Sequence, residues 1–141
     1  MPYDLNPDEV LAYGNRRRQA TSNWASQTNA LNYRANIADQ NYGQQVGAQT
    51  RNWQRSRERL PGSFANRGLQ TSGLYGRALS DFNTQRDESF GQLARDYYNQ
   101  RAQFGMERSG LDQQYWNEMA NIDDQERLRR AQIAAQLTGA Y

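Results

Sequence analysis

Residues 82–115 read FNTQRDESFGQLARDYYNQRAQFGMERSGLDQQY, and this stretch decides the fold. Large apolar residues recur in it every eleven positions, namely Phe82, Leu93, Phe104 and Tyr115. Glu126 interrupts the series, and Leu137 resumes it. An eleven-residue repeat corresponds to about 3.67 residues per helical turn, so these side chains follow one side of a helix almost straight. The stretch therefore predicts a long α-helix with one narrow apolar stripe.

A second series with the same spacing stands in the N-terminal half, at Leu31, Tyr42 and Trp53. The helix that carries it should begin near residue 7, because Asn6 can cap it and Pro7 fits the first turn. Pro61 and Gly62 should end it, since proline cannot continue the hydrogen-bond ladder of a helix.

These patterns predict an all-α fold of two long helices, elongated and not globular, joined by a connector that contains proline and glycine. We place an N-terminal helix region at residues 1–59, the connector at 60–73 and a C-terminal long helix region at 74–141.

The composition indicates that this fold depends on neighbouring chains. Leu, Ile, Val and Phe supply only 20 of the 141 residues, a share at which chains are usually disordered. The formal net charge is only +2, however, and nine Tyr and three Trp add amphipathic contact area. We therefore expect an ordered, assembly-dependent chain, with disorder of the isolated chain as the alternative.

One side of each predicted helix carries the side chains that we expect to contact partners. Two narrow stripes packed together leave aromatic side chains at their edges in water. These edge residues are Trp24, Trp53, Tyr98 and Trp116. We expect several copies of the chain to pack against one another and against other proteins. The partner-contact stripe comprises Trp24, Leu31, Tyr42, Trp53, Phe82, Leu93, Phe104, Leu111, Tyr115, Ile122, Ile133 and Leu137.

The residue types that most often perform catalysis are missing. The sequence has no Cys, His or Lys, and so lacks the commonest general base, the thiol nucleophile and the Schiff-base amine. Adjacent carboxylates such as Asp123 and Asp124 point to different sides of a helix. We expect a protein that is not an enzyme, with no catalytic residue, no cofactor and no metal site.

Neither a membrane-spanning segment nor an export signal is recognisable. No apolar run approaches the length of a bilayer span, and residues 1–10 lack the basic start and apolar core of a signal peptide. The expectation is a soluble protein that is not secreted.

All 17 basic residues are Arg, and some of them cluster near aromatic residues. Such an arrangement suits phosphate contact and base stacking. The 15 acidic residues are spread along the same helices, so the electrostatic footprint is weak. DNA contact is therefore a candidate that we do not favour over Arg–carboxylate pairing between subunits. The candidate nucleic-acid residues are Arg16, Arg17, Arg18, Arg55, Arg57 and Arg59.

The second half of the chain resembles a known group of proteins. Residues 64–82 read FANRGLQTSGLYGRALSDF, and the Gln-rich stretch that follows ends in QERLRRAQIAAQL at residue 137. Residues 64–137 resemble small helical virion proteins of tailed bacteriophages, in which a short Arg-Gly-Leu…Ser-Gly turn leads into a long Ala- and Gln-rich helix. The resemblance implies a structural role in the tail, the neck or the internal ejection machinery, without catalysis.

Together these observations predict a non-enzymatic structural component of a tailed-phage virion, assembled in the host cytoplasm. Its copies would pack as helices against tail, neck or portal-region proteins. Two alternatives stay open. An internal DNA-contacting ejection protein, released with the genome, would use the Arg clusters. A capsid-assembly scaffold would be absent from mature particles.

Overall fold

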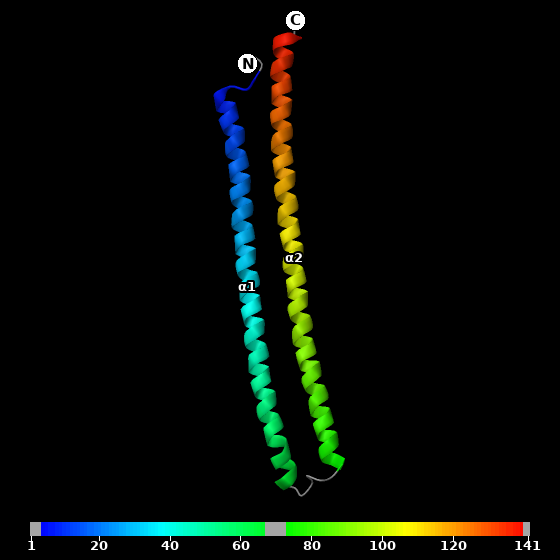
Figure 1. Ribbon diagram of the computed structural model, residues 1–141. Coiled ribbons are helices and arrows are strands. Elements are labelled where there is room, and N and C mark those ends of the chain that lie inside the picture. Colours follow the sequence, from blue (N-terminus) through cyan, green and yellow to red (C-terminus); the bar gives the residue numbers. More distant parts are fainter. Residues whose placement is uncertain (1–3, 67–72, 140–141) are drawn as a thin grey trace. The chain divides into compact units, whose positions relative to one another are not determined.

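The computed structural model describes residues 4–66 and 73–139, and these residues form two α-helices (Figure 1). Helix α1 spans Pro7–Asn66 and has 60 residues, and helix α2 spans Gly73–Thr138 and has 66. Within these two ranges the chain forms no β-strand. The predicted all-α fold of two long helices is confirmed.

Helix α1 begins where the sequence predicts. The side-chain oxygen of Asn6 accepts a hydrogen bond from the Glu9 amide at 2.8 Å, which satisfies one of the free N–H groups of the first turn. Asp8 and Glu9 place negative charge next to the positive end of the helix dipole. Leu5, just before the cap, is buried, so the entry to the helix is also fixed by packing.

The end of α1 differs from the prediction. The helix does not stop before Pro61 but includes it and continues to Asn66. Packing beyond the proline explains this result: Phe64 is buried and meets the Tyr75 ring edge-on, with the ring centroids 5.4 Å apart. This contact offsets the hydrogen bond that proline removes. Residues 67–72 of the predicted connector lie outside the described residues, and its last residue, Gly73, already begins α2.

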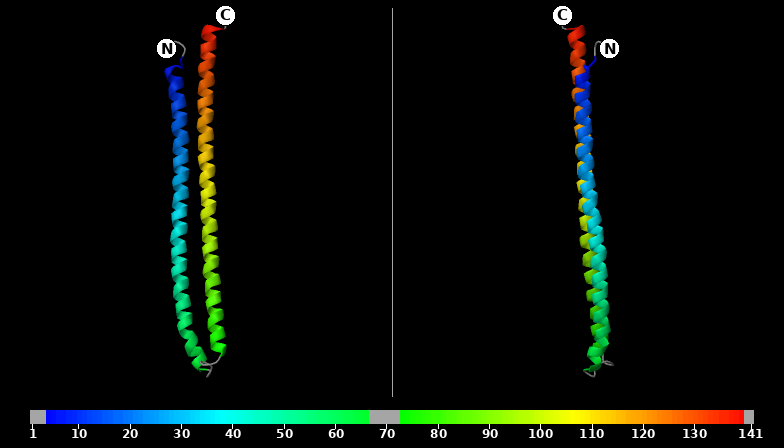
Figure 2. Two further views of the ribbon diagram at one scale, coloured as in Figure 1. Left: turned by 45° about the vertical axis from the view of Figure 1, so that its right-hand side comes forward. Right: turned by 90° about the vertical axis from the view of Figure 1, so that its left-hand side faces the viewer.

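The helices contribute to two compact units. The terminal unit contains the described residues of Met1–Tyr33 and Phe104–Tyr141, and the central unit contains those of Arg34–Gln103. In each unit a segment of α1 lies beside a segment of α2 that runs in the opposite direction (Figures 1 and 2). We call the contact between the two segments of a unit its seam.

The seams bury few side chains. Among the described residues, Thr28 is a buried polar residue with 4% of its surface exposed. The buried apolar residues among those described are Leu5, Ala20, Leu31, Ala38, Phe64 and Ile122. One eleven-residue series along α1 consists of Ala20, Leu31, Tyr42, Trp53 and Phe64. Ala20, Leu31 and Phe64 are buried, and Tyr42 and Trp53 are half-buried. The repeat therefore marks the side of α1 that packs on α2. Each position of such a series is called a rung, and the α1 series extends one rung beyond Trp53, to Phe64.

Candidate functional site

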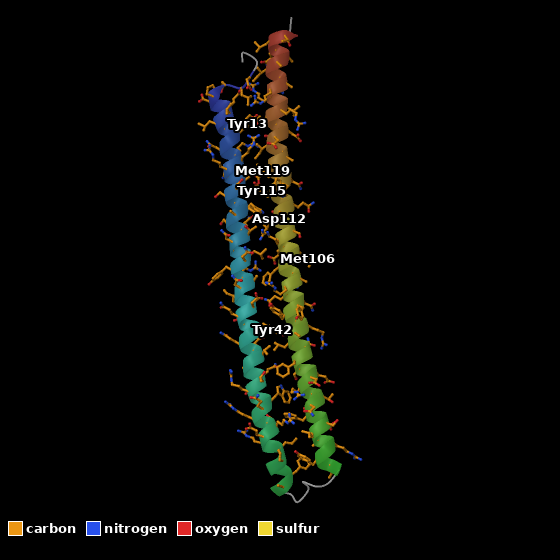
Figure 3. The ribbon with its side chains drawn as sticks, in the orientation of Figure 1. Tyr13, Tyr42, Met106, Asp112, Tyr115 and Met119 are labelled. Carbon is orange, nitrogen blue, oxygen red and sulfur yellow. The ribbon has the colours of Figure 1, made fainter. Side chains whose placement is uncertain are left out.

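In the terminal unit, Trp24 is the centre of an aromatic and charged layer. Its ring stacks on Tyr115, with centroids 5.1 Å apart and planes 28° apart. Its indole N–H donates to Asp112 at 2.8 Å, and the Arg108 guanidinium lies 5.7 Å from the ring centroid. Figure 3 shows Asp112 and Tyr115 projecting from α2 toward α1. Both the apolar face and the polar atom of Trp24 are thus used within the chain.

Glu126, the missing rung of the α2 series, lies in an ion-pair cluster of the same unit. Arg17 pairs with Glu126 and also donates to Asp123 at 2.7 Å. Arg130 donates to Glu126 at 3.0 Å and pairs with Asp4. The hydrogen bonds to Glu126 and then to Asp123 raise the pKa of Arg17 above its ordinary value. The Glu126 side chain is only 17% exposed, so a charge replaces an apolar rung without being left unpaired.

We expect replacement of Glu126 by leucine to lower the free energy of unfolding by about 1–3 kcal/mol, between the values typical of exposed and buried ion pairs. The reason is that Arg17 loses its least exposed partner. Urea unfolding of Glu126→Leu, Arg17→Met and the double variant forms a double-mutant cycle. The double variant should recover most of the loss, because two apolar side chains then face each other. Strictly additive effects would show that the two charges are not coupled.

In the central unit, Tyr42 and Tyr97 stack almost in parallel, with centroids 4.1 Å apart and planes 9° apart. The Tyr97 hydroxyl donates to Asp39 at 2.6 Å, and Arg101 lies 3.5 Å from the other oxygen of the same carboxylate. Tyr42 lies between the two helices in Figure 3. The hydrogen bond to Asp39, assisted by burial, raises the pKa of Tyr97 above its ordinary value of 10.0.

The raised pKa predicts a loss of stability in alkali. A group whose pKa is higher in the folded chain stabilises the fold fully below its unfolded pKa, and this contribution is lost as the pH rises through the folded pKa. The window therefore opens near pH 10 and extends upward. Tyr97→Phe keeps the ring but removes the proton. The difference in Tm between the natural chain and Tyr97→Phe should narrow between about pH 8 and about pH 11. A constant difference would exclude the Asp39 bond as the cause.

A groove lies next to Trp53 in the same unit. The Trp53 ring meets Phe82 edge-on, with centroids 5.0 Å apart and planes 77° apart. The groove has a volume of about 240 Å³. Its lining mixes rings with guanidinium groups, and we call it the Trp53 groove: Thr50, Trp53, Gln54, Arg57, Phe82, Arg86 and Phe90.

The predicted partner-contact stripe lies mostly along the seams. Leu31 and Ile122 are buried, whereas Leu137 is 45% exposed. The remaining members are half-buried: Trp24, Tyr42, Trp53, Phe82, Leu93, Phe104, Leu111, Tyr115 and Ile133. The rings of Trp24, Tyr42, Trp53, Phe82 and Tyr115 contact rings of the same chain. Contact of the stripe with partner chains stays a prediction.

Exposed apolar residues lie elsewhere on the helices. Tyr98 and Trp116 are each 66% exposed, as expected for the edge of the stripe. The same expectation is wrong for Trp24 and Trp53, which are half-buried because α2 supplies Tyr115 and Phe82 as ring partners. Leucine, methionine and tyrosine side chains are exposed to a similar degree, for example Leu128 at 64%, Met106 at 68% and Tyr33 at 67%.

The first Arg cluster is used inside the chain. Arg16 donates to Gln125 at 2.6 Å and lies over the Tyr13 ring, and Arg17 belongs to the ion-pair cluster of Glu126. Arg18 donates to Asn15, on its own helix, at 3.3 Å. Arg16 and Arg17 therefore have the weakest case, among the candidate arginines, for contacting another subunit or a nucleic acid.

The second Arg cluster has a different environment. Arg55, Arg57 and Arg59 are exposed, and none forms an ion pair within the part of the chain that the structure describes. Their neighbour Arg51 is also exposed, and it too forms no ion pair with a described residue.

Several contributing residues escape sequence reasoning. Phe64 falls in the predicted connector and Tyr75 in no predicted site, although Phe64 follows Trp53 at the eleven-residue spacing and contacts Tyr75. Glu126 holds a position of the α2 series, so the spacing itself marks it as a seam residue. Asp39 and Asp112 carry no such signal, because an isolated carboxylate among polar residues does not reveal which ring faces it.

Two further properties concern metals and membranes. Over residues 4–66 and 73–139, no three acidic side chains gather closely enough to hold a metal ion. In the same ranges neither helix contains a stretch sufficiently long and apolar to cross a bilayer. Comparison with known proteins found no matching family model, curated protein or solved structure.

Proposed function

We propose that this chain is a non-enzymatic structural component of a larger assembly. One observation carries the proposal: large apolar side chains on the surface outnumber the buried apolar residues among those described. Burial of each such side chain on a partner contributes about 1.5–3 kcal/mol. The exposed set is Val10, Leu11, Tyr33, Ile37, Leu74, Tyr98, Met106, Trp116, Leu128 and Leu137.

The partners that suit this surface are helices with apolar stripes, including copies of the same chain. Single exposed apolar residues are normal on any protein, but here they accompany seams with very few buried residues. Packing of neighbouring chains against these exposed apolar side chains would therefore stabilise the fold. The Gln and Asn residues, 30 in all, supply neutral hydrogen-bonding groups around these contacts.

The assembly that we propose is the virion of a tailed bacteriophage, at the tail, neck or portal region. The support is the resemblance of residues 64–137 to small helical virion proteins. A scaffold for capsid assembly is the alternative, and it differs in being absent from mature particles.

Two measurements test the proposal. Light scattering and far-UV circular dichroism on the isolated chain should show multimers, or a weakly folded monomer that orders on association. A compact monomer with a cooperative thermal transition would contradict the assembly role. Mass spectrometry of purified particles of the encoding phage should then detect the chain. Detection only in immature capsids would favour the scaffold instead.

A further inference from the structure

Two rings of α2 project away from the seams. Tyr98 and Trp116 are each 66% exposed. Each of them directly follows a tyrosine that stacks on a ring of α1, namely Tyr97 in the central unit and Tyr115 in the terminal unit. Successive residues of a helix are turned by about 100° from each other. Because the stacks hold the two seam tyrosines against α1, the ring that follows each of them is turned outward.

The same short sequence pattern surrounds both rings. Residues 93–100 read LARDYYNQ, and residues 111–118 read LDQQYWNE. The two patterns share Leu, Tyr and Asn, and they are 18 residues apart on one uninterrupted helix. Eighteen residues make five turns, so equivalent positions occupy the same side of α2. The half-buried leucine and first tyrosine of each pattern serve the seam, whereas the exposed second ring is repeated without a use there.

The side of α2 that carries these rings, the outer face, has similar residues at equal distances before and after position 107. The two rings are nine residues away, Ala94 and Ala120 are thirteen away, and Gly105 and Ser109 are two away. These positions follow one another at steps of four or seven, so they share one side of the helix. A Cβ atom added at Gly105 would meet nothing within 4 Å, so the surface there is open.

Opposite charges stand at the two ends of the outer face. Asp87 lies twenty residues before position 107 and Arg127 twenty residues after it. Their side chains are 73% and 78% exposed, and their ion-pair partners, Arg86 and Asp124, are near neighbours on α2. Exposed pairs of this kind contribute little to stability, so both side chains are available to another chain. A copy of α2 that runs in the opposite direction places its Arg127 next to Asp87.

We propose that the outer face of α2 binds the same face of a second copy of this chain, with the two helices antiparallel about position 107. Tyr98 of each copy packs on Trp116 of the other, and an Asp87–Arg127 ion pair forms at each end. Such an isologous contact closes as a dimer. A second copy has the required order of rings, small residues and charges by identity, whereas an unrelated helix would have to reproduce it. This inference rests on the proposed assembly role and names its partner.

Cysteine cross-linking tests the alignment, because the natural chain has no Cys. Gly105→Cys in one copy faces Ser109→Cys in the other, whereas identical positions are four residues, or about 6 Å, out of step. Air oxidation of an equimolar mixture of the two variants should therefore give severalfold more disulfide-linked dimer than either variant alone. Equal cross-linking in each variant alone, or none in the mixture, would overturn the antiparallel alignment.

Sedimentation velocity tests the two rings. Tyr98→Ala and Trp116→Ala should each weaken dimerisation at least tenfold, because either change removes a ring from both ring pairs. For the same reason, the loss in the double variant should be much smaller than the product of the two single losses. Fully independent losses would show that the two rings do not meet. Far-UV circular dichroism checks that each variant remains helical.

Tyr33→Ala is the matched control for the rings. Tyr33 is a ring of α1 with 67% exposure, and it does not belong to the outer face. This variant should dimerise within about threefold of the natural chain. An equal loss in Tyr33→Ala would mean that exposed rings associate without specificity. Association that no outer-face variant changes would overturn this inference and leave the assembly role standing, whereas a cooperatively folded monomer would contradict the assembly role itself.

Charge reversal tests the ends of the outer face. Asp87→Arg or Arg127→Asp alone should weaken dimerisation severalfold, because like charges then face each other at both ends. The variant with both changes restores opposite charges and should recover most of the affinity. Absence of recovery would show that Asp87 and Arg127 are not partners.

Discussion

Replacing Ile122 by alanine should produce one of the two largest losses of stability among the single substitutions considered for this chain. Ile122 is 1% exposed, the lowest value among the described residues that are buried. Such a truncation in a core costs about 2–5 kcal/mol, because it removes buried methyl groups and leaves a cavity. Few of the described residues are buried, so little other packing can compensate for the loss. We expect a loss of about 2–3 kcal/mol and a fall in Tm of roughly 10 °C or more.

Leu128→Ala is the matched control for this prediction. Leu128 lies on the same helix but is 64% exposed, so its truncation should change stability by less than about 0.5 kcal/mol. Thermal unfolding followed by circular dichroism compares the two. Equal effects would mean that Ile122 is not buried in the way that the structure describes.

The second large effect is expected for Trp24→Ala. This change removes the stack on Tyr115 and the indole hydrogen bond, and it leaves the Asp112 carboxylate with Arg108 alone. Large aromatic truncations in a full core cost about 3–5 kcal/mol. Because Trp24 is half-buried, we expect about 2–3 kcal/mol.

Trp116→Ala separates folding from assembly in the same experiment. Trp116 is 66% exposed and touches Tyr115 at a ring distance of 5.1 Å. Its truncation should lower the unfolding free energy by only about 0.5 kcal/mol, far less than Trp24→Ala, yet reduce association measured by sedimentation velocity. Loss of stability equal to that of Trp24→Ala would contradict the difference in burial. Unchanged association would argue against Trp116 as an assembly contact.

The helical architecture could be predicted because it depends on local signals. The eleven-residue spacing and the Asn6 cap act within a few turns of chain, and both are found in the helices. The end of α1 could not be predicted in this way. The local preference of Pro61 against helix is outweighed by a contact between Phe64 and Tyr75, which belong to different helices.

The candidate site was predictable only in part, for a similar reason. The stripe gives the side of each helix that is apolar, but it does not tell whether the opposing surface is α2 of the same chain or another protein. Trp24 and Trp53 find their ring partners within the chain, whereas Trp116 stays exposed. The Arg clusters look alike in sequence. Only the positions of distant carboxylates such as Glu126 distinguish the paired Arg17 from the unpaired Arg55.

The charged residue at position 126 of the α2 series, Glu126, also affects how the two helix segments of the terminal unit are aligned along each other. Rungs that repeat every eleven residues allow one helix to slide past the other by a whole rung, about 16.5 Å, and to meet similar apolar neighbours again. Such a slide would move Glu126 from Arg17 to the level of Thr28, a buried residue without charge. An unpaired carboxylate there is costly. A single glutamate thus makes one alignment of an otherwise repetitive surface lower in free energy than its shifted alternatives, as a buried polar residue does in some coiled coils.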